Sequence, residues 1–332
     1  MVIDHSGSRF DSCHLHKIFD EVVMKVLIVN IDSKIPNLAL AKIEKYHRDR
    51  GDEIFYDLPI YRDIVDKIYV SCVFSWNKFL AEQWNFEHTE IGGTGWDILK
   101  KLPPEIDKVK PRINIGFTTR GCIRKCKFCV VPKKEGHIYI EGDIYDIWDG
   151  KSKDIVLLDN NILALPEHFF FITDQIKKEK LRVDFNQGLD CRLLTDDIAK
   201  RLSEINHAEY KFAFDFVEIE PYVIKAINLL KKYGIKRCTW YVLVGFNTTP
   251  EQDLYRINLL RKLNQNVFVQ RYNYKSNKKV KSNLFYTALS RWANQHHIFQ
   301  GMDFKQFLNY PENRHYKDFC LKYDYPISLQ DS

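Results

Sequence analysis

The sequence predicts an α/β protein in which a partial barrel of six β/α repeats follows a small doubly wound domain and precedes a helical cap. Short apolar runs, typical of buried strands, alternate with helical segments along most of the chain, as in parallel sheets. Pro103, Pro104 and Pro111 interrupt this alternation, because proline biases the residue before it toward extended structure. The predicted organisation is an N-terminal extension at 1–23, the doubly wound domain at 24–110, the barrel core at 111–272 and the helical cap at 273–332.

Composition and hydropathy place the chain among ordinary globular proteins. Of its 332 residues, 45% are hydrophobic and 28% charged, and the formal net charge of +6 does not by itself imply a nucleic-acid partner. No apolar run reaches the 18 residues of a membrane span, and the first residues lack the apolar segment of a secretory signal. We therefore expect no membrane partner. A cluster of cysteines favours a reducing compartment, so we expect a cytoplasmic protein.

The doubly wound domain is predicted from a βαβ pattern. Pro36 is expected as the first residue of a helix that ends at Arg50, because proline suits the first helical turn. Strands are expected at Val26–Ile31, Ile54–Tyr56, Lys67–Phe74 and Thr89–Ile91. The last strand runs into Gly92-Gly93-Thr94-Gly95, which indicates either a phosphate cradle or a plain tight turn; without the GxGxxG spacing, the tight turn is favoured.

The barrel core is predicted from six strands and the helices between them. Thr249, Pro250 and Gln252 form a capping box that marks the start of the last of these helices. The strands are expected at Ile113–Thr118, Asp154–Leu158, Leu181–Phe185, Lys211–Phe214, Cys238–Val244 and Val267–Gln270, and the helices at Pro166–Lys178, Thr195–Ile205, Pro221–Tyr233 and Thr249–Leu263. In the tail we expect one or two short helices, of which Ala288–His297 is the clearest.

Polar residues follow most of the predicted strands. In barrels of this type the chemistry sits at the carboxyl ends of the strands, so these residues are candidate site residues. Asp and Asn also favour turns, which is the alternative interpretation. The candidates are Asp159, Asn160 and Asn161 after the second strand, Asn186, Gln187, Asp190 and Arg192 after the third, Asp215 after the fourth and Val244 at the end of the fifth.

Three cysteines stand close together in the stretch from Ile113 to Gly136. At Cys122, Cys126 and Cys129 their spacing lets one loop wrap three sulfurs around one centre, and a chain of this composition has this spacing by chance on the order of half a percent of the time. Thiolates are soft ligands that suit zinc or iron–sulfur clusters. A three-Cys zinc loop and reduced buried thiols are the alternatives. Cys191 and Cys238 could add a ligand, although lone cysteines beside strands are more often buried fillers.

The CxxxCxxC spacing, with Phe128 before the last cysteine, resembles the signature loop of the radical S-adenosylmethionine (radical SAM) superfamily. Thr119-Arg120-Gly121 and Val130-Val131-Pro132 resemble in particular its methylthiotransferase and cobalamin-binding branches. The resemblance covers Ile113–Tyr272 and implies a partial (β/α)6 radical SAM barrel. It also implies a [4Fe-4S] cluster whose open iron binds S-adenosylmethionine, reductive cleavage of that molecule and hydrogen abstraction by a 5′-deoxyadenosyl radical.

The same resemblance implies roles for the candidate residues. Cys122, Cys126 and Cys129 would hold the cluster, and the backbone of Phe128 would lie beside adenine. The other implied contacts are Asp159, Asn160 and Asn161 at the methionine amino group, Asn186, Gln187 and Asp190 at the ribose, Arg192 at the methionine carboxylate and Val244 at adenine, with Asp215 nearby. No residue is assigned as catalytic.

Residues 24–110 resemble the Rossmann-like domain that precedes the core in cobalamin-binding members. In those members a His in a DxHxxG motif after the first strand is the lower cobalt ligand. Here Asp32-Ser33-Lys34-Ile35-Pro36-Asn37 occupies that place and holds no His. We therefore do not expect cobalamin as a cofactor.

The substrate cannot be read from the sequence. Arg271–Lys281 carries five basic residues and two tyrosines, which makes nucleic acid a candidate partner, although a solvated loop explains the charge as well. A small-molecule substrate is equally open, and an electron donor such as flavodoxin or ferredoxin is implied. The rival functions are a non-enzymatic zinc-binding module and an iron–sulfur electron-transfer protein.

Overall fold

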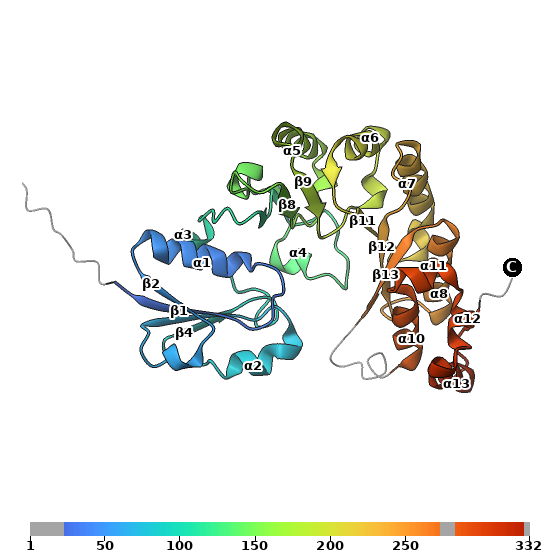
Figure 1. Ribbon diagram of the computed structural model, residues 1–332, viewed down its shortest axis with the longest axis horizontal. Helices are drawn as coiled ribbons and strands as arrows, with labels where there is room; N and C mark the ends of the chain where they lie inside the picture. The colour runs from blue at the N-terminus through green and yellow to red at the C-terminus, as the bar shows by residue number, and fades with distance from the viewer. Residues whose placement is uncertain (1–22, 273–282, 329–332) are drawn as a thin grey trace, which may run out of the picture. The chain divides into compact units, whose positions relative to one another are not determined.

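The computed structural model describes residues 23–272 and 283–328, and these form a mixed α/β protein with parallel sheets (Figure 1). The chain divides into two compact units, of which the first ends at Val109 and the second begins at Lys110. The predicted N-terminal extension lies almost wholly outside the described residues, as does most of the basic stretch Arg271–Lys281.

The first unit is built on a four-stranded parallel sheet in the order β2-β1-β3-β4. The strands are β1 (Lys25–Asn30), β2 (Glu53–Tyr56), β3 (Lys67–Ser71) and β4 (Thr89–Gly92). Alternate residues of β1 face opposite sides, so that Val26 and Ile28 pack with α1 (Leu38–Asp49) and α3 (Pro104–Asp107), whereas Leu27 and Val29 pack toward α2 (Lys78–Glu82). Both faces of the sheet are therefore covered, as parallel sheets require.

Helix α1 begins two residues later than the sequence predicts. Asn37, and not Pro36, defines its start, because the Asn37 side chain accepts a hydrogen bond from the Leu40 N–H at 3.2 Å. An Asn at this position satisfies a backbone donor that proline cannot. The strand expected at Lys67–Phe74 is also shorter than predicted, since Asp32 accepts from the N–H groups of Val73 and Phe74 and draws them out of the sheet.

The Gly92–Gly95 turn packs against the chain that follows β3. A Cβ atom at Gly93, where φ is +98°, would lie 2.3 Å from the Cys72 carbonyl oxygen, and a Cβ at Gly95 would lie 2.4 Å from the Phe74 backbone. Gly92 has open space at the same position. Close approach of two backbones thus accounts for Gly93 and Gly95 without a phosphate ligand.

The second unit contains two short parallel sheets. One has the order β10-β9-β8-β5 and the other β11-β12-β13, and an isolated parallel bridge joins Leu189 to Phe212. The strands are β5 (Ile115–Gly116), β8 (Asp154–Leu157), β9 (Arg182–Phe185), β10 (Asn206–His207), β11 (Lys211–Ala213), β12 (Thr239–Val244) and β13 (Asn266–Arg271). All their pairings are parallel, so their carboxyl ends meet at one edge.

The helices between these strands agree with the predicted ones to within one residue at each end. They are α5 (Pro166–Glu179), α6 (Asp196–Glu204), α7 (Glu220–Lys232) and α8 (Pro250–Lys262). The Thr249–Gln252 capping box at the start of α8 is confirmed. Figure 1 shows α5, α6 and α7 following one another along the same side of the strands.

One hydrophobic core joins the strands and the C-terminal helices. Phe169, Phe212 and Trp240 from the β/α repeats belong to the same buried cluster as Phe285 and Trp292 from the tail. The tail forms α10 (Leu284–Ala293), α11 (His296–Gly301), α12 (Phe304–Leu308) and α13 (Arg314–Lys322). The C-terminal helices are thus part of the packing of the second unit.

In the second unit, two asparagines account for two differences between the predicted and the observed elements. Asn114 adopts a left-handed φ of +63° and exchanges hydrogen bonds with Asp149, which shortens the strand expected at Ile113–Thr118. The Asn294 side chain pairs with both backbone groups of Val269 on β13. This contact separates α10 from α11, so the single helix predicted at Ala288–His297 is wrong.

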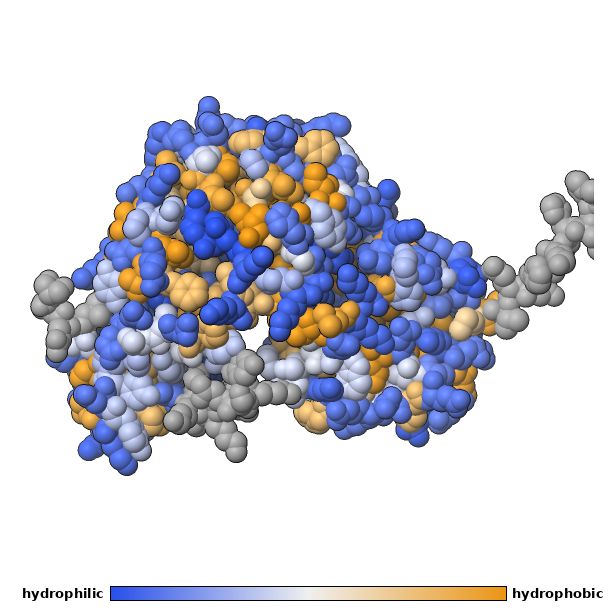
Figure 2. All heavy atoms as spheres, turned by 180° about the vertical axis from the view of Figure 1, so that it is seen from behind, coloured by the Kyte–Doolittle hydropathy of each residue, from blue (hydrophilic) through white to orange (hydrophobic). Residues whose placement is uncertain are grey.

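One face of the protein has a surface of mixed character. On the face seen in Figure 2, hydrophobic side chains are interspersed with hydrophilic ones. Among residues 23–272 and 283–328, no helix combines the length and apolar character needed to cross a membrane.

Gly93→Ala should destabilise the first unit by about 3 kcal/mol, because the new methyl group overlaps the Cys72 carbonyl in a left-handed backbone. Gly92→Ala is the matched control and should change the free energy of unfolding by less than about 0.5 kcal/mol. Urea unfolding of the full chain, followed by tryptophan fluorescence, measures both. Equal stability of the two variants would show that the backbones do not approach as described.

Candidate functional site

The three cysteines lie on a loop that connects two paired antiparallel strands. β6 (Thr119–Arg120) pairs with β7 (Tyr139–Ile140), and the short helix α4 (Val131–Lys134) lies in the loop between them. Three free thiols of intermediate exposure are on this loop, at Cys122, Cys126 and Cys129. The sequence predicted the loop but not the ladder that closes it.

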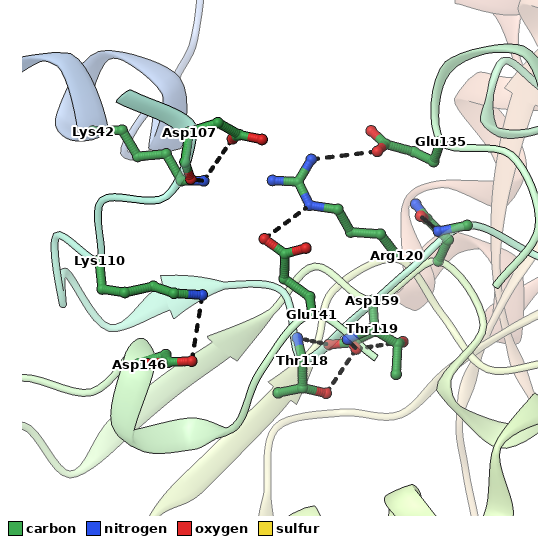
Figure 3. A network of polar contacts seen from close by, with 12 residues as sticks. Lys42, Asp107, Lys110, Thr118, Thr119, Arg120, Glu135, Glu141, Asp146 and Asp159 are labelled. Atoms are coloured by element: carbon green, nitrogen blue, oxygen red, sulfur yellow. Dashed lines mark hydrogen bonds and ion pairs between the residues drawn. The ribbon is translucent and has the colours of Figure 1, made fainter. Parts of the chain in front are cut away.

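Ion pairs and a glycine hold the base of the loop. Arg120, on β6, lies between Glu135 at 3.3 Å and Glu141 at 3.6 Å, two residues that follow the cysteines (Figure 3). Gly121 has a φ of +81°, and a Cβ there would lie 2.4 Å from the His137 carbonyl oxygen. The start of the loop is thereby fixed against its end.

Asp159 and Asn160 attach this loop to the end of β8. The buried Asp159 carboxylate accepts hydrogen bonds from the hydroxyl groups of Thr118 at 2.8 Å and Thr119 at 2.6 Å and from both backbone N–H groups (Figure 3). Burial raises the pKa of Asp159, although these donors oppose the shift. Asn160 accepts from the Gly121 N–H at 3.0 Å. The structure thus places both residues against the backbone of the loop.

Asn161 contacts the first of the three thiols. Its side-chain nitrogen is 3.4 Å from the Cys122 sulfur and 3.4 Å from Asp190 Oδ2. Asp190 also pairs with Arg124, on the cysteine loop, at 3.0 Å. The structure therefore brings Asn161 and Asp190, predicted from separate strands, together at Cys122.

The Arg192 side chain forms an ion pair with Asp190. Its Nε and Nη2 atoms donate to the two oxygens of Asp190 at 2.7 and 3.0 Å. Burial would raise the pKa of Asp190, but its hydrogen bonds and charge contacts with Arg192 and Arg124 outweigh burial and lower it. Asp190 is therefore an anchored carboxylate at the end of β9, and an incoming carboxylate would share Arg192 with it.

The remaining candidates lie at the same edge of the strands. Asp215 accepts from the Leu243 N–H at 3.2 Å, and burial raises its pKa. Val244 is buried, and its carbonyl accepts from the Tyr272 N–H at 2.9 Å. Asn186 is half-buried and Gln187 exposed, and neither side chain has a hydrogen-bond partner among the described residues. Their predicted contacts with S-adenosylmethionine stay predictions.

The cysteine loop makes aromatic contacts that were not predicted. The Phe128 ring lies 6.0 Å from that of Phe216, which follows β11, and 5.7 Å from that of Phe246, which follows β12. Tyr272, after β13, contacts Phe246 at 4.5 Å. The sequence did hold a signal for these contacts, because an aromatic residue stands one to three positions after each of three successive strands. These rings give the strand ends an apolar wall.

A buried ion pair behind this wall was also missed. Arg256 and Asp253 on α8 are both fully buried and lie 2.5 Å apart. Arg256 donates to the carbonyls of Phe214 and Leu243, and Asp253 accepts from the Gly245 N–H at 3.1 Å. The pair thus fixes the strand ends from which the aromatic residues follow. Sequence reasoning places charged helix residues in solvent, so it gave no signal for this pair.

The donor set of the loop fits an iron–sulfur cluster. Among residues 23–272 and 283–328, no group of three or more His, Cys, Asp or Glu side chains is arranged to hold a metal ion. The thiolates of a cubane bind different iron atoms, however, so their sulfurs need not converge on one point. Burial raises the pKa of Cys126 and Cys129, so the charge of a bound metal would be needed to favour their thiolates.

Comparison with known proteins supports the fold. No family model and no curated protein matches the chain. Its fold is similar to that of a solved radical S-adenosylmethionine methyltransferase, with a TM-score of 0.56 and 13% sequence identity over 75% of each chain. That protein is TsrM from Kitasatospora setae, in a structure with cobalamin and a [4Fe-4S] cluster bound. At this identity the likeness is one of fold.

The comparison corrects our expectation about cobalamin. We expected no cobalamin because Asp32–Asn37 holds no His, whereas the solved structure of similar fold contains cobalamin. The reasoning was wrong because a His supplies only one axial cobalt ligand, and its absence says nothing about contacts with the rest of the cofactor. In this chain the Asp32 carboxylate is occupied by the N–H groups of Val73 and Phe74.

Asp253→Asn should destabilise the second unit by about 3–5 kcal/mol, because it leaves the buried Arg256 guanidinium without a counter-charge. The control is Asp318→Asn, which removes an exposed pair with Arg314 at 3.9 Å and should cause no measurable change. Thermal unfolding followed by circular dichroism compares the two. Similar melting temperatures would contradict a structural role for the buried pair.

Proposed function

We propose that the chain is a radical SAM enzyme that binds a [4Fe-4S] cluster through Cys122, Cys126 and Cys129. The observation that carries this proposal is one closed loop with three free thiols, anchored at the carboxyl ends of parallel strands. The fold similarity to a radical SAM methyltransferase supports it. The parallel, sequential order of the strands in the second unit supports a partial (β/α)6 barrel, and the order β2-β1-β3-β4 supports a Rossmann-like first unit.

The cluster, when reduced, would supply the electron that cleaves S-adenosylmethionine to a 5′-deoxyadenosyl radical for hydrogen abstraction. The residues of this chain would bind, orient and exclude water. Phe128, Phe216 and Phe246 would give the cofactor an apolar wall. Asp190 and Arg192, which follow β9, would offer polar contacts.

Methyl transfer is the net reaction that we propose to test first, because the solved structure of similar fold is a methyltransferase. A flavodoxin or ferredoxin is the proposed electron donor. The substrate class stays open between a small molecule and a nucleic acid. Of the basic stretch Arg271–Lys281, only Arg271 and Tyr272 are described, and Arg271 donates to the Thr287 hydroxyl at 2.8 Å.

Cobalamin is the second cofactor that we propose, at the carboxyl ends of β1 and β3, where the strand order of the first unit reverses. Hydroxocobalamin mixed with the purified full-length protein should co-elute in gel filtration at about one equivalent. Its retention is measured by the corrin absorbance. Complete separation of corrin from protein, with and without a reconstituted cluster, would reject this cofactor.

The enzyme activity is tested with anaerobically reconstituted, reduced protein and S-adenosylmethionine, with 5′-deoxyadenosine quantified by mass spectrometry. Cys126→Ala should lose the cluster and at least about 99% of the product, because only two loop thiolates remain. Cys320→Ala removes a buried thiol of α13, away from the loop in sequence, and should retain both.

Metal analysis of the same samples separates the alternatives. Iron with acid-labile sulfide supports the cluster, whereas stoichiometric zinc in colourless protein would support a zinc-binding module. A reducible cluster without 5′-deoxyadenosine, in the presence of bound S-adenosylmethionine, would favour an electron-transfer protein.

A further inference from the structure

The sulfur of Cys122 belongs to a closed ring of contacts with Arg124, Asp190 and Asn161. The backbone N–H of Arg124 donates to this sulfur at 3.3 Å, and Asn161 Nδ2 donates to it at 3.4 Å. The Arg124 guanidinium then pairs with Asp190 Oδ2 at 3.0 Å, and Asn161 Nδ2 lies 3.4 Å from the same oxygen. Asp190 therefore holds both residues that donate to the Cys122 sulfur.

The orientation of the Asn161 amide follows from its neighbours. The side chain is buried, and within the described residues its Oδ1 has no hydrogen-bond partner. The opposite orientation would turn this oxygen toward the Asp190 carboxylate and the sulfur, which are both acceptors. Asp190 is in turn fixed by two hydrogen bonds from the Arg192 side chain. The amide thus presents its N–H groups to Cys122 and Asp190.

We propose that Asn161, oriented by Asp190, raises the reduction potential of the [4Fe-4S] cluster by donating a hydrogen bond to the Cys122 sulfur. The inference rests on the proposed function, since it requires a cluster bound through this thiolate. One-electron reduction adds negative charge to the cluster and its sulfurs, and a hydrogen bond to sulfur stabilises the more negative state. Asn161 is buried, so little water competes for its amide N–H groups.

The test is a redox titration of the reconstituted full-length protein without S-adenosylmethionine, with mediators setting the potential and electron paramagnetic resonance reporting the reduced cluster. Asn161→Leu keeps a side chain of similar size and removes both N–H donors. Its midpoint potential should fall by about 59 mV, which is a tenfold change in the ratio of reduced to oxidised cluster.

Three further variants separate the hydrogen bond from charge and polarity. Asn160→Asp keeps the acceptor for the Gly121 N–H and adds a charge, so its shift measures charge alone. Asn186→Leu removes an amide that has no side-chain hydrogen bond among the described residues and should titrate like the wild type. Asn161→Asp loses the donor and gains a charge, so its potential should fall below that of Asn160→Asp.

The outcomes distinguish the inference from the proposed function. If Asn161→Leu binds the cluster but titrates no lower than Asn186→Leu, the hydrogen bond does not set the potential, and the proposed function still stands. If Asn161→Leu does not fold, equal potentials of Asn161→Asp and Asn160→Asp overturn the inference instead. Wild-type protein that takes up neither iron nor sulfide overturns both.

Discussion

The candidate site depends on the hydrogen bonds that the buried Asp159 carboxylate accepts from Thr118 and Thr119. A desolvated carboxylate must be satisfied by donors, and Asp159 takes its donors from Thr118 and Thr119, which are 41 and 40 residues away in sequence. The next two residues make the next two contacts: Asn160 accepts from the Gly121 N–H, and Asn161 donates to the Cys122 sulfur. Successive residues after β8 thus contact successive residues at the start of the cysteine loop, and this correspondence fixes where the first thiol lies.

Two groups of contacts support the site, one polar and one apolar. Near the thiols the contacts are polar and bring together the ends of β8 and β9 through Asn161 and Asp190. At the ends of β11 and β12 the contacts with the loop are aromatic and come from the rings of Phe216 and Phe246. The ion pair of Asp253 and Arg256 holds these strand ends in place. A polar side and an apolar side facing one loop suit a cofactor with a charged part and a flat aromatic part.

Local signals made much of this structure predictable. The cysteine spacing, the proline and capping-box starts of the helices, and the polar residues after apolar strands are all short-range patterns, and Asp159, Asn161 and Asp190 were selected from them. Their partners were not predictable, because the contacts join segments far apart in the chain. Asn114 and Asn294 ended elements early for the same reason, since distant backbone or carboxylate groups bind their side chains. Arg256 was missed because a buried arginine needs partners that no periodicity reveals. The exclusion of cobalamin failed because one absent ligand is too little to exclude a large cofactor.

The loop with the three thiols is closed by its own ladder, between Thr119–Arg120 and Tyr139–Ile140. The three sulfurs are also close in sequence, and closing so short a loop costs little conformational entropy. Asn161 and Asp190 come to the loop from the ends of β8 and β9, and lie 39 residues from Cys122 and 66 residues from Arg124. The ligands of the proposed metal centre are thus local in the chain, whereas the groups that would surround it come from distant strands, so a change far away in sequence can alter the surroundings and leave the ligands themselves intact.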